Sequence, residues 1–303
     1  MPEGVAMHMK IKPLLALAGT LILFSTYEIV SKTIAYQVPP LQINFWRFLF
    51  GGMLLLPVAL VINHQAERSL TRADLFRLGR LGLVMVALSL PMLQQAITYI
   101  PASTAAVLFC TNPLFAHLFA AMLQGEKMSV RTWSGLLVSL TGISLIITSE
   151  IINLDFTWRI LLGLGLSLAS ALFFGLYIVL AKGEAERVGG VTVNAITFIA
   201  GAIITLPLML WFQVPLLFFD PAALPQMLYL TIGITCGAFL LFLYALQHLS
   251  AATSSLIFFI KPLSATLLAI WWLQEKATPT FMLGTVVVVA GLFFADKKIS
   301  PPS

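Results

Sequence analysis

Three ionisable side chains interrupt long apolar stretches of the 303-residue chain: Glu28, Arg47 and Lys261. An ionised group at the centre of a bilayer costs about 2.5–3.5 kcal/mol on insertion scales, so such groups usually face a water-filled cavity or a partner. A carboxylate at that depth can bind an ammonium or a proton, and a buried cation can hold a carboxylate. These residues are therefore the first candidates for a substrate-binding site.

Glu28 lies near the end of the first apolar stretch, on one helical stripe with Phe24 and Tyr27. Lys32 follows at i+4, which is the favourable order for a local ion pair. Two hypotheses follow. Glu28 either forms a structural pair with Lys32, or faces a cavity where it contacts substrate and exchanges the proton that couples transport. The burial of a carboxylate favours the cavity.

Arg47 and Lys261 differ in depth. Arg47 is about six residues into its stretch, close enough to the interface to snorkel, so snorkelling and substrate contact both remain open. Lys261 lies in the middle of its stretch, immediately before Pro262. Proline removes a backbone N–H and disturbs the preceding turn, and half-broken helices of this kind line transporter cavities. We expect Lys261 to face a cavity; the alternative is a structural pair with Glu28.

Weaker candidates surround these three groups. Tyr27 and Phe24, with Tyr177, are expected either to wall the cavity or to pack in the core, and His117 either relays protons or packs as an ordinary histidine. Asn112 precedes a proline as Lys261 does, and Ser264 shares a helical stripe with Lys261. The predicted substrate-binding set is Glu28, Lys261, Arg47, Tyr27, Phe24, Tyr177, Asn112 and Ser264, and the predicted proton-coupling residues are Glu28 and His117.

The composition shows what must position these groups. The chain is 59% hydrophobic and 10% charged, against about 45–50% and about 25% in soluble domains. The excess apolar surface predicts an all-α polytopic membrane protein, since a spanning helix needs about 20 apolar residues. Ten windows meet that length: 13–34, 41–62, 79–99, 103–123, 133–149, 159–181, 191–212, 225–246, 252–273 and 280–296.

The 17 basic residues set the expected orientation. With the N-terminus in the cytoplasm, twelve of them fall inside, three outside and two within spans. Because cytoplasmic loops carry the excess of Lys and Arg, the tails 1–12 and 297–303 are both predicted to be cytoplasmic, in a multi-pass protein of the cell (cytoplasmic) membrane. The same placement in short loops argues against a nucleic-acid partner.

The chain also repeats itself. A shift of 149 or 150 residues superposes two segments, 13–149 and 159–296, each with five windows. Five is odd, so the second repeat enters the membrane from the opposite side, which is typical of secondary transporters with a site near the midplane. The superposed pairs include Tyr27 and Tyr177, Lys32 and Lys182, Pro113 and Pro262, Glu126 and Glu275, Gly135 and Gly284, and Gly142 and Gly291.

Four segments in this order resemble the drug/metabolite transporter superfamily, in its EamA-type ten-helix branch: "FSTYEIVSK", "NFWRFLFGG", "NPLFAHLFAAMLQGEK" and "KPLSATLLAIWWLQEK". The resemblance covers essentially the whole chain. It implies carriage of small metabolites, often amino acids, by alternating access around a central cavity. Many similar proteins are exporters driven by a proton or substrate gradient.

These observations predict a secondary active transporter that exports an amino acid or another small carboxylate. The alternatives are a proton-coupled exporter of multidrug or cationic compounds and, in another class, a channel or lipid flippase. An enzyme is not expected because the sequence has no HExxH, no GxSxG and no close His/Asp set. The cysteines Cys110 and Cys236 lack metal-type spacing, so neither a metal nor a cofactor is expected. The glycine pairs indicate a packing scaffold or a homodimer surface.

Overall fold

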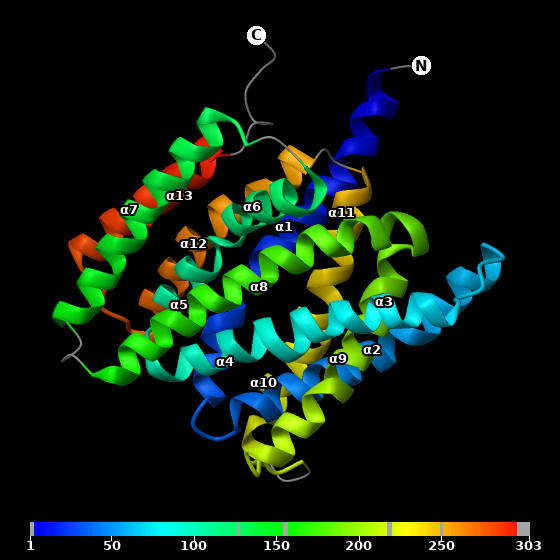
Figure 1. Ribbon diagram of the computed structural model, residues 1–303, viewed down its shortest axis with the longest axis horizontal. Coiled ribbons are helices and arrows are strands. Elements are labelled where there is room, and N and C mark those ends of the chain that lie inside the picture. The colour runs from blue at the N-terminus through cyan, green and yellow to red at the C-terminus, as the bar shows by residue number, and fades with distance from the viewer. Residues whose placement is uncertain (1–2, 126–127, 154–156, 217–219, 249–250, 296–303) are drawn as a thin grey trace.

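The computed structural model describes residues 3–125, 128–153, 157–216, 220–248 and 251–295, and the regular elements in these ranges are all helices. They form an inclined bundle (Figure 1). The elements are α1 Glu3–Ile34, α2 Pro40–Gln65, α3 Arg72–Gly82, η1 Leu83–Ser89, α4 Leu90–Tyr99, α5 Ala102–Phe109, α6 Asn112–Gln124, α7 Val130–Asn153, α8 Trp158–Val188, α9 Gly190–Trp211, η2 Pro221–Ala223, α10 Leu224–Leu228, η3 Tyr229–Ala238, α11 Phe239–His248, α12 Ala251–Leu273 and α13 Pro279–Ala295.

Ten apolar helical segments occupy the ten predicted windows. Among the described residues, eight of them are long and apolar enough to cross a membrane, and the other two are the stretch Ile257–Leu273 of α12 and the helix α13, Pro279–Ala295. The prediction of an all-helical polytopic membrane protein is therefore confirmed. The eight long segments are Ile11–Ile34, Pro40–Gln65, Arg72–Tyr99, Ala102–Gln124, Val130–Ile152, Trp158–Val188, Gly190–Trp211 and Pro221–Phe242.

Several helix ends differ from the predicted windows for local reasons. Helix α3 begins at Arg72 because Thr71 and Asp74 form a capping box, in which each side chain accepts a hydrogen bond from the other's backbone N–H. Helix α8 continues to Val188, and the chain leaves it at Gly189, whose φ of +85° glycine adopts without strain. Helix α1 begins at Glu3, so most of the predicted tail 1–12 is helical.

Two stretches of π-helix were not predicted. The first, η1, interrupts the third span at residues 83–89, and the second, η3, interrupts the eighth at residues 229–238. The repeat shift of 149 carries the first onto residues 232–238 of the second. Segment η1 packs against α8 and α9, and η3 packs against α1 and α2. π-Bulges are frequent at functional sites, so these matched stretches mark where the two halves meet.

A helix break accompanies Pro113 of the first repeat and not Pro262 of the second, where it was expected. Helix α12 runs through Pro262 without interruption, so the prediction of a broken helix at Lys261 is wrong. The fourth span does break, between Phe109 at the end of α5 and Asn112 at the start of α6. There Asn112 Nδ2 donates to the carbonyl of Phe109 at 2.8 Å, and Thr111 Oγ1 donates to that of Leu108 at 2.6 Å. The Asn112 amide satisfies the Phe109 carbonyl, whose i+4 donor is missing because residue 113 is proline, while the Leu108 carbonyl also accepts the Thr111 N–H at 3.2 Å.

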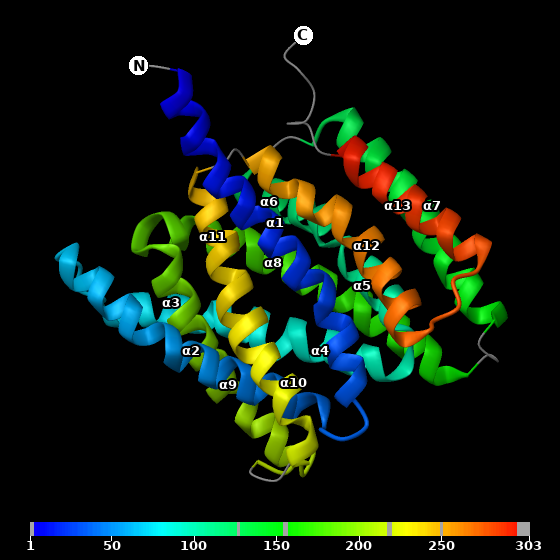
Figure 2. The same cartoon turned by 180° about the vertical axis from the view of Figure 1, so that it is seen from behind.

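Helices of the first half of the chain pack against helices of the second half. Helix α2 packs along α9, α1 along α11 and α12, and α8 along α4 and α6. Helix α1 begins and α13 ends at the same end of the bundle, as both views show (Figures 1 and 2). Helices α7 and α13 lie side by side along one flank, so the last helix of each half contacts its counterpart.

Glycines make the close approach of α7 and α13 possible. A Cβ built at Gly142 would lie 2.6 Å from the backbone N of Val288 and 2.8 Å from the carbonyl oxygen of Gly284. A Cβ at Gly284 would in turn lie 2.9 Å from the Gly142 oxygen. Small residues of this kind allow membrane helices to pack backbone to backbone.

Gly142→Val is expected to lower stability by about 1–3 kcal/mol, the usual range for overpacking, because the obstructing atoms belong to the α13 backbone. The measurement is the thermal midpoint of the purified protein in detergent, followed by size-exclusion chromatography. Gly165→Val is the matched control, since a Cβ at Gly165 meets nothing within 4 Å. Equal midpoints for the two variants would contradict the tight crossing.

Candidate functional site

A buried ion pair joins α1 to α12. Lys261 Nζ lies 2.7 Å from Glu28 Oε1, with side-chain exposures of 6% and 0%. The structure thus contains the Lys261–Glu28 pair that was the alternative to a cavity-facing Lys261, and it contradicts the Glu28–Lys32 pair. The Lys32 ammonium instead donates to the carbonyls of Ile97 at 2.6 Å and Ile100 at 2.8 Å. The second carboxylate oxygen of Glu28 accepts no hydrogen bond from the described residues, so the carboxylate retains room for another donor.

An aromatic row extends from the ammonium of the pair. The Nζ atom of Lys261 lies 5.1 Å from the ring centre of Phe109, within cation–π range. Phe109 contacts Phe174 at 5.0 Å between ring centres, and Phe174 contacts Tyr177 at 5.6 Å. Tyr177, which was predicted to wall the cavity, is thus separated from Lys261 by the rings of Phe109 and Phe174. Phe109 was missed in the sequence, where nothing distinguishes it from other apolar residues of its span.

Arg47 is the second buried cation of the cluster. Only 2% of its surface is exposed, and its guanidinium lies 4.6 Å from the ring centre of Tyr27 and 4.5 Å from that of Phe48. Its Nε and Nη1 atoms have no hydrogen-bond partner among the described residues, and none of the ion pairs found in those ranges includes it. The side chain therefore stays inside the bundle, which contradicts snorkelling, and substrate contact by Arg47 stays a prediction.

Neutral polar groups near Arg47 also keep free hydrogen-bonding atoms. Tyr27 donates its hydroxyl to Gln94 Oε1 at 2.7 Å, and Gln94 Nε2 is buried with no partner in the described part of the chain. Asn44, one helical turn before Arg47 on α2, donates to the carbonyl of Val86 at 2.7 Å, and its Oδ1 is equally unpartnered. Arg47 and Gln94 therefore both contact Tyr27, and Asn44 lies one turn from Arg47 on α2. Together they offer a cation, an amide donor and an amide acceptor.

The remaining predicted residues divide between the cluster and the packing around it. Ser264 Oγ lies 2.6 Å from Ser25 Oγ, which ties α12 to α1 beside the ion pair. Phe24 packs against rings of α11, with ring centres 5.2 and 6.3 Å apart. His117 Nδ1 lies 2.7 Å from the carbonyl oxygen of Pro113 in its own helix, as the packing alternative expects.

Glu150 is a further buried carboxylate, which the sequence did not predict. Glu150 is 7% exposed and accepts a hydrogen bond of 2.5 Å from Thr104 Oγ1. It directly follows the window 133–149, whose boundary placed it in a loop. The helix α7 continues to Asn153, which carries Glu150 against α5.

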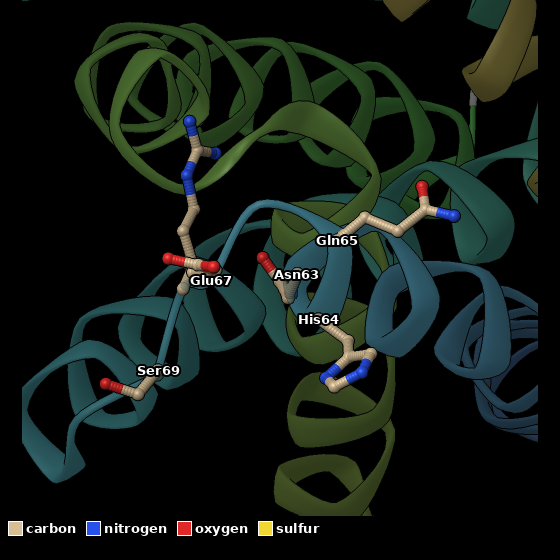
Figure 3. A pocket seen from close by; sticks show the side chains of 6 residues that line it. Asn63, His64, Gln65, Glu67 and Ser69 are labelled. Atoms are coloured by element: carbon tan, nitrogen blue, oxygen red, sulfur yellow. The ribbon is translucent and has the colours of Figure 1, made fainter.

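Two pockets lie away from this cluster. A groove of about 370 Å³ is bounded by α1, α10, η3 and α12, and is lined by Thr26, Ile29, Val30, Pro225, Gln226, Tyr229, Leu268 and Trp272. A shallow hollow of about 390 Å³ lies at the end of α2 and the turn that follows, where the side chains spread apart rather than converging (Figure 3). Neither contains Glu28, Arg47 or Lys261, which are closed off from the surface in this conformation.

The whole chain is similar to proteins of one known family. The model of the EamA-like transporter family matches the chain twice, at residues 11–148 and 161–295. The chain belongs to the EamA-like transporter family. The predicted resemblance is confirmed, and an EamA-family protein is a transporter rather than an enzyme.

Individual relatives agree with this assignment. The EamA-family chain is 36% identical to an uncharacterized transporter of Clostridium kluyveri over 90% of its own length and 89% of that protein. It is 26% identical, over 66% of each chain, to a probable terminal-alkyne amino-acid exporter of Streptantibioticus cattleyicolor. A solved crystal structure superposes with a TM-score of 0.67 at 19% identity, covering 94% of this chain and 97% of the other, which supports the fold alone.

Proposed function

We propose that this EamA-family protein is a secondary active transporter that exports an amino acid or another small carboxylate by alternating access. The imbalance of buried charge carries the proposal. Glu28 neutralises Lys261 at 2.7 Å, and two nitrogens of the buried Arg47 guanidinium have no partner among the residues that the structure describes. An unpaired charge in an apolar interior is costly, and a carboxylate that binds the guanidinium fork would remove that cost with two charge-assisted hydrogen bonds.

The second charge of the substrate has a place beside the pair. One carboxylate oxygen of Glu28 has no donor in the described part of the chain, and a substrate ammonium or a proton would bind there. A zwitterionic amino acid would then contact Arg47 with one end and Glu28 with the other. The relative named as a probable amino-acid exporter supports both this substrate class and the direction.

Inverted repeats and cytoplasmic termini complete the proposed mechanism. The family model matches two successive segments, the π-helical stretches fall at matching positions, and each half packs its first helices against the other half. Rocking of the halves about a shared axis would expose the central cluster to one side of the membrane at a time.

The first test compares ligands that differ by one charge. Purified protein is heated with an amino-acid panel, the matching methyl esters and the matching acids that lack the amine. A ligand at 100 times its Kd stabilises by about 2.7 kcal/mol. We expect stabilisation by the amino acids, none by the esters, and flux of the stabilising compounds in proteoliposomes at two values of pH. Stabilisation by esters or cationic drugs alone would overturn the carboxylate and indicate a cation exporter.

A lipid-headgroup flippase is the second candidate. It is favoured by the groove between α1 and α12, where Thr26 Oγ1 lies 2.6 Å from the Tyr229 hydroxyl and the lining is otherwise apolar except for Gln226. Fluorescent phospholipid movement in the same proteoliposomes distinguishes the two. Lipid movement without uptake of soluble carboxylates would replace the first proposal by the second.

A further inference from the structure

The corner between α4 and α5 is held by residues from other parts of the chain. Helix α5 begins after Pro101, whose side chain provides no capping hydrogen bond. Glu275, in the connection between α12 and α13, accepts hydrogen bonds from Ala102 N at 2.7 Å, Ser103 N at 3.1 Å and Ser103 Oγ at 2.6 Å. The first N–H groups of a helix lack internal partners and favour negative charge. Glu275 is therefore the cap of α5, supplied from more than 170 residues away.

The other side of the same corner is held by a cation. Lys32, near the end of α1, donates to the carbonyls of Ile97 and Ile100 at 2.6 and 2.8 Å. These are among the last carbonyls of α4, where a helix favours positive charge. One corner is thus fixed by two opposite charges, from α1 and from the α12–α13 connection.

This corner lies directly beyond the central cluster. Lys32 follows Glu28 by one helical turn, about 6 Å along α1. Ser31, which lies between them in the sequence, is fully buried, and its hydroxyl has no partner in the described ranges. Lys32 and its contacts with α4 therefore lie between Glu28 and the end of α1.

The repeat counterparts of the two charges are Lys182 and Glu126, and Glu126 lies outside the described residues. Lys182 aligns with Lys32 under the shift of 150, yet Lys182 is exposed on α8 whereas Lys32 is partly buried against α4. The two lysines therefore differ in burial, as is expected of a carrier with one end closed.

We propose that Glu275 and Lys32 form a lock that closes this end of the transporter over the Glu28, Arg47 and Lys261 cluster. Release of the Glu275 carboxylate from the start of α5 frees the corner to swing away from α1 and opens the path to the cluster. The proposal rests on the proposed transport function, but it concerns access and not the substrate.

The test measures access without using a substrate. Both native cysteines, Cys110 and Cys236, are buried and free, and replacing them with alanine gives a background for a Ser31→Cys reporter. A membrane-impermeant maleimide is applied to intact cells and to inverted vesicles. Glu275→Ala is expected to raise the labelling rate of the reporter at least about tenfold from one side only. Glu275→Gln, which keeps one acceptor oxygen, should give an intermediate rate.

Lys276→Ala is the matched control, because Lys276 is adjacent in sequence and exposed. It should label at the background rate. Size-exclusion profiles identify any variant that fails to fold. If Glu275→Ala fails, the labelling rate of the reporter in Glu275→Gln tests the proposal instead. Glu275 variants that lose thermal stability while labelling like Lys276→Ala would make Glu275 a structural cap only and overturn the lock, while leaving the ligand panel of the transport proposal unaffected.

Discussion

Lys261→Met is expected to destabilise the protein by about 3–5 kcal/mol and to abolish transport, because it leaves the Glu28 carboxylate buried without its counter-ion. The measurement is the thermal midpoint in detergent, with proteoliposome flux on the same preparation. Methionine has a similar length to the lysine side chain, so loss of packing contributes little. Lys182→Met, at the exposed counterpart of Lys32 on α8, is the control for removing a lysine from a membrane helix.

The double variant Glu28→Gln/Lys261→Met separates charge from packing. It contains neither charge, so we expect it to regain most of the lost stability while remaining inactive. Replacing a buried ion pair by neutral groups is often neutral or stabilising, whereas removing one partner is strongly destabilising. If Lys261→Met alone were as stable as the parent protein, the ion pair would have no energetic role in the fold.

Arg47→Gln is expected to act in the opposite sense on the protein without ligand. The guanidinium is buried, and two of its nitrogens have no partner within the described ranges, so its removal should leave the thermal midpoint unchanged or raise it. Carboxylate binding, however, should weaken at least about a hundredfold, since hydrogen bonds to charged groups contribute about 1.5–3 kcal/mol each and 1.4 kcal/mol is a factor of ten. Isothermal titration with the best amino acid of the panel measures the change.

Two further variants sharpen this prediction. Arg47→Lys keeps the charge but loses the planar fork that binds a carboxylate with two parallel bonds, so it should recover only a small part of the affinity. Arg159→Gln removes an exposed arginine that lies 6.0 Å from the Trp158 ring centre and should bind normally. Unchanged affinity in Arg47→Gln would place the substrate anion elsewhere in the protein.

The sequence was sufficient to predict the number and type of helices and the residues of the charged cluster, because both follow from the solvation of single groups in a bilayer. It left open which charges pair, because both Lys32 and Lys261 were candidate partners of Glu28. The i+4 rule favoured Lys32 as the partner of Glu28, whereas the structure supplies Lys261, 233 residues further along the chain. A local rule does not include a tertiary competitor, and the carbonyls of α4 are an equally favourable partner for Lys32.

The sequence also did not predict where the helices break or become π-helical. Pro113 and Pro262 occupy equivalent positions, yet only the first accompanies a break between helices. The difference comes from the preceding residue. Asn112 has a short amide that bonds to a nearby carbonyl, whereas the long side chain of Lys261 extends to another helix. The π-helical stretches likewise depend on how the two halves pack and have no signature in hydrophobic spacing.

The pairing of α7 with α13 has a consequence for how the chain is made. About 125 residues separate Asn153, the end of α7, from Pro279, the start of α13. At about 5–20 residues per second, synthesis of that length takes about 6–25 s. Throughout this interval the glycine face of α7 has no native partner in the nascent chain. The insertion machinery, or lipid, must cover that face until α13 emerges, so the last helix to be translated completes the first half of the protein.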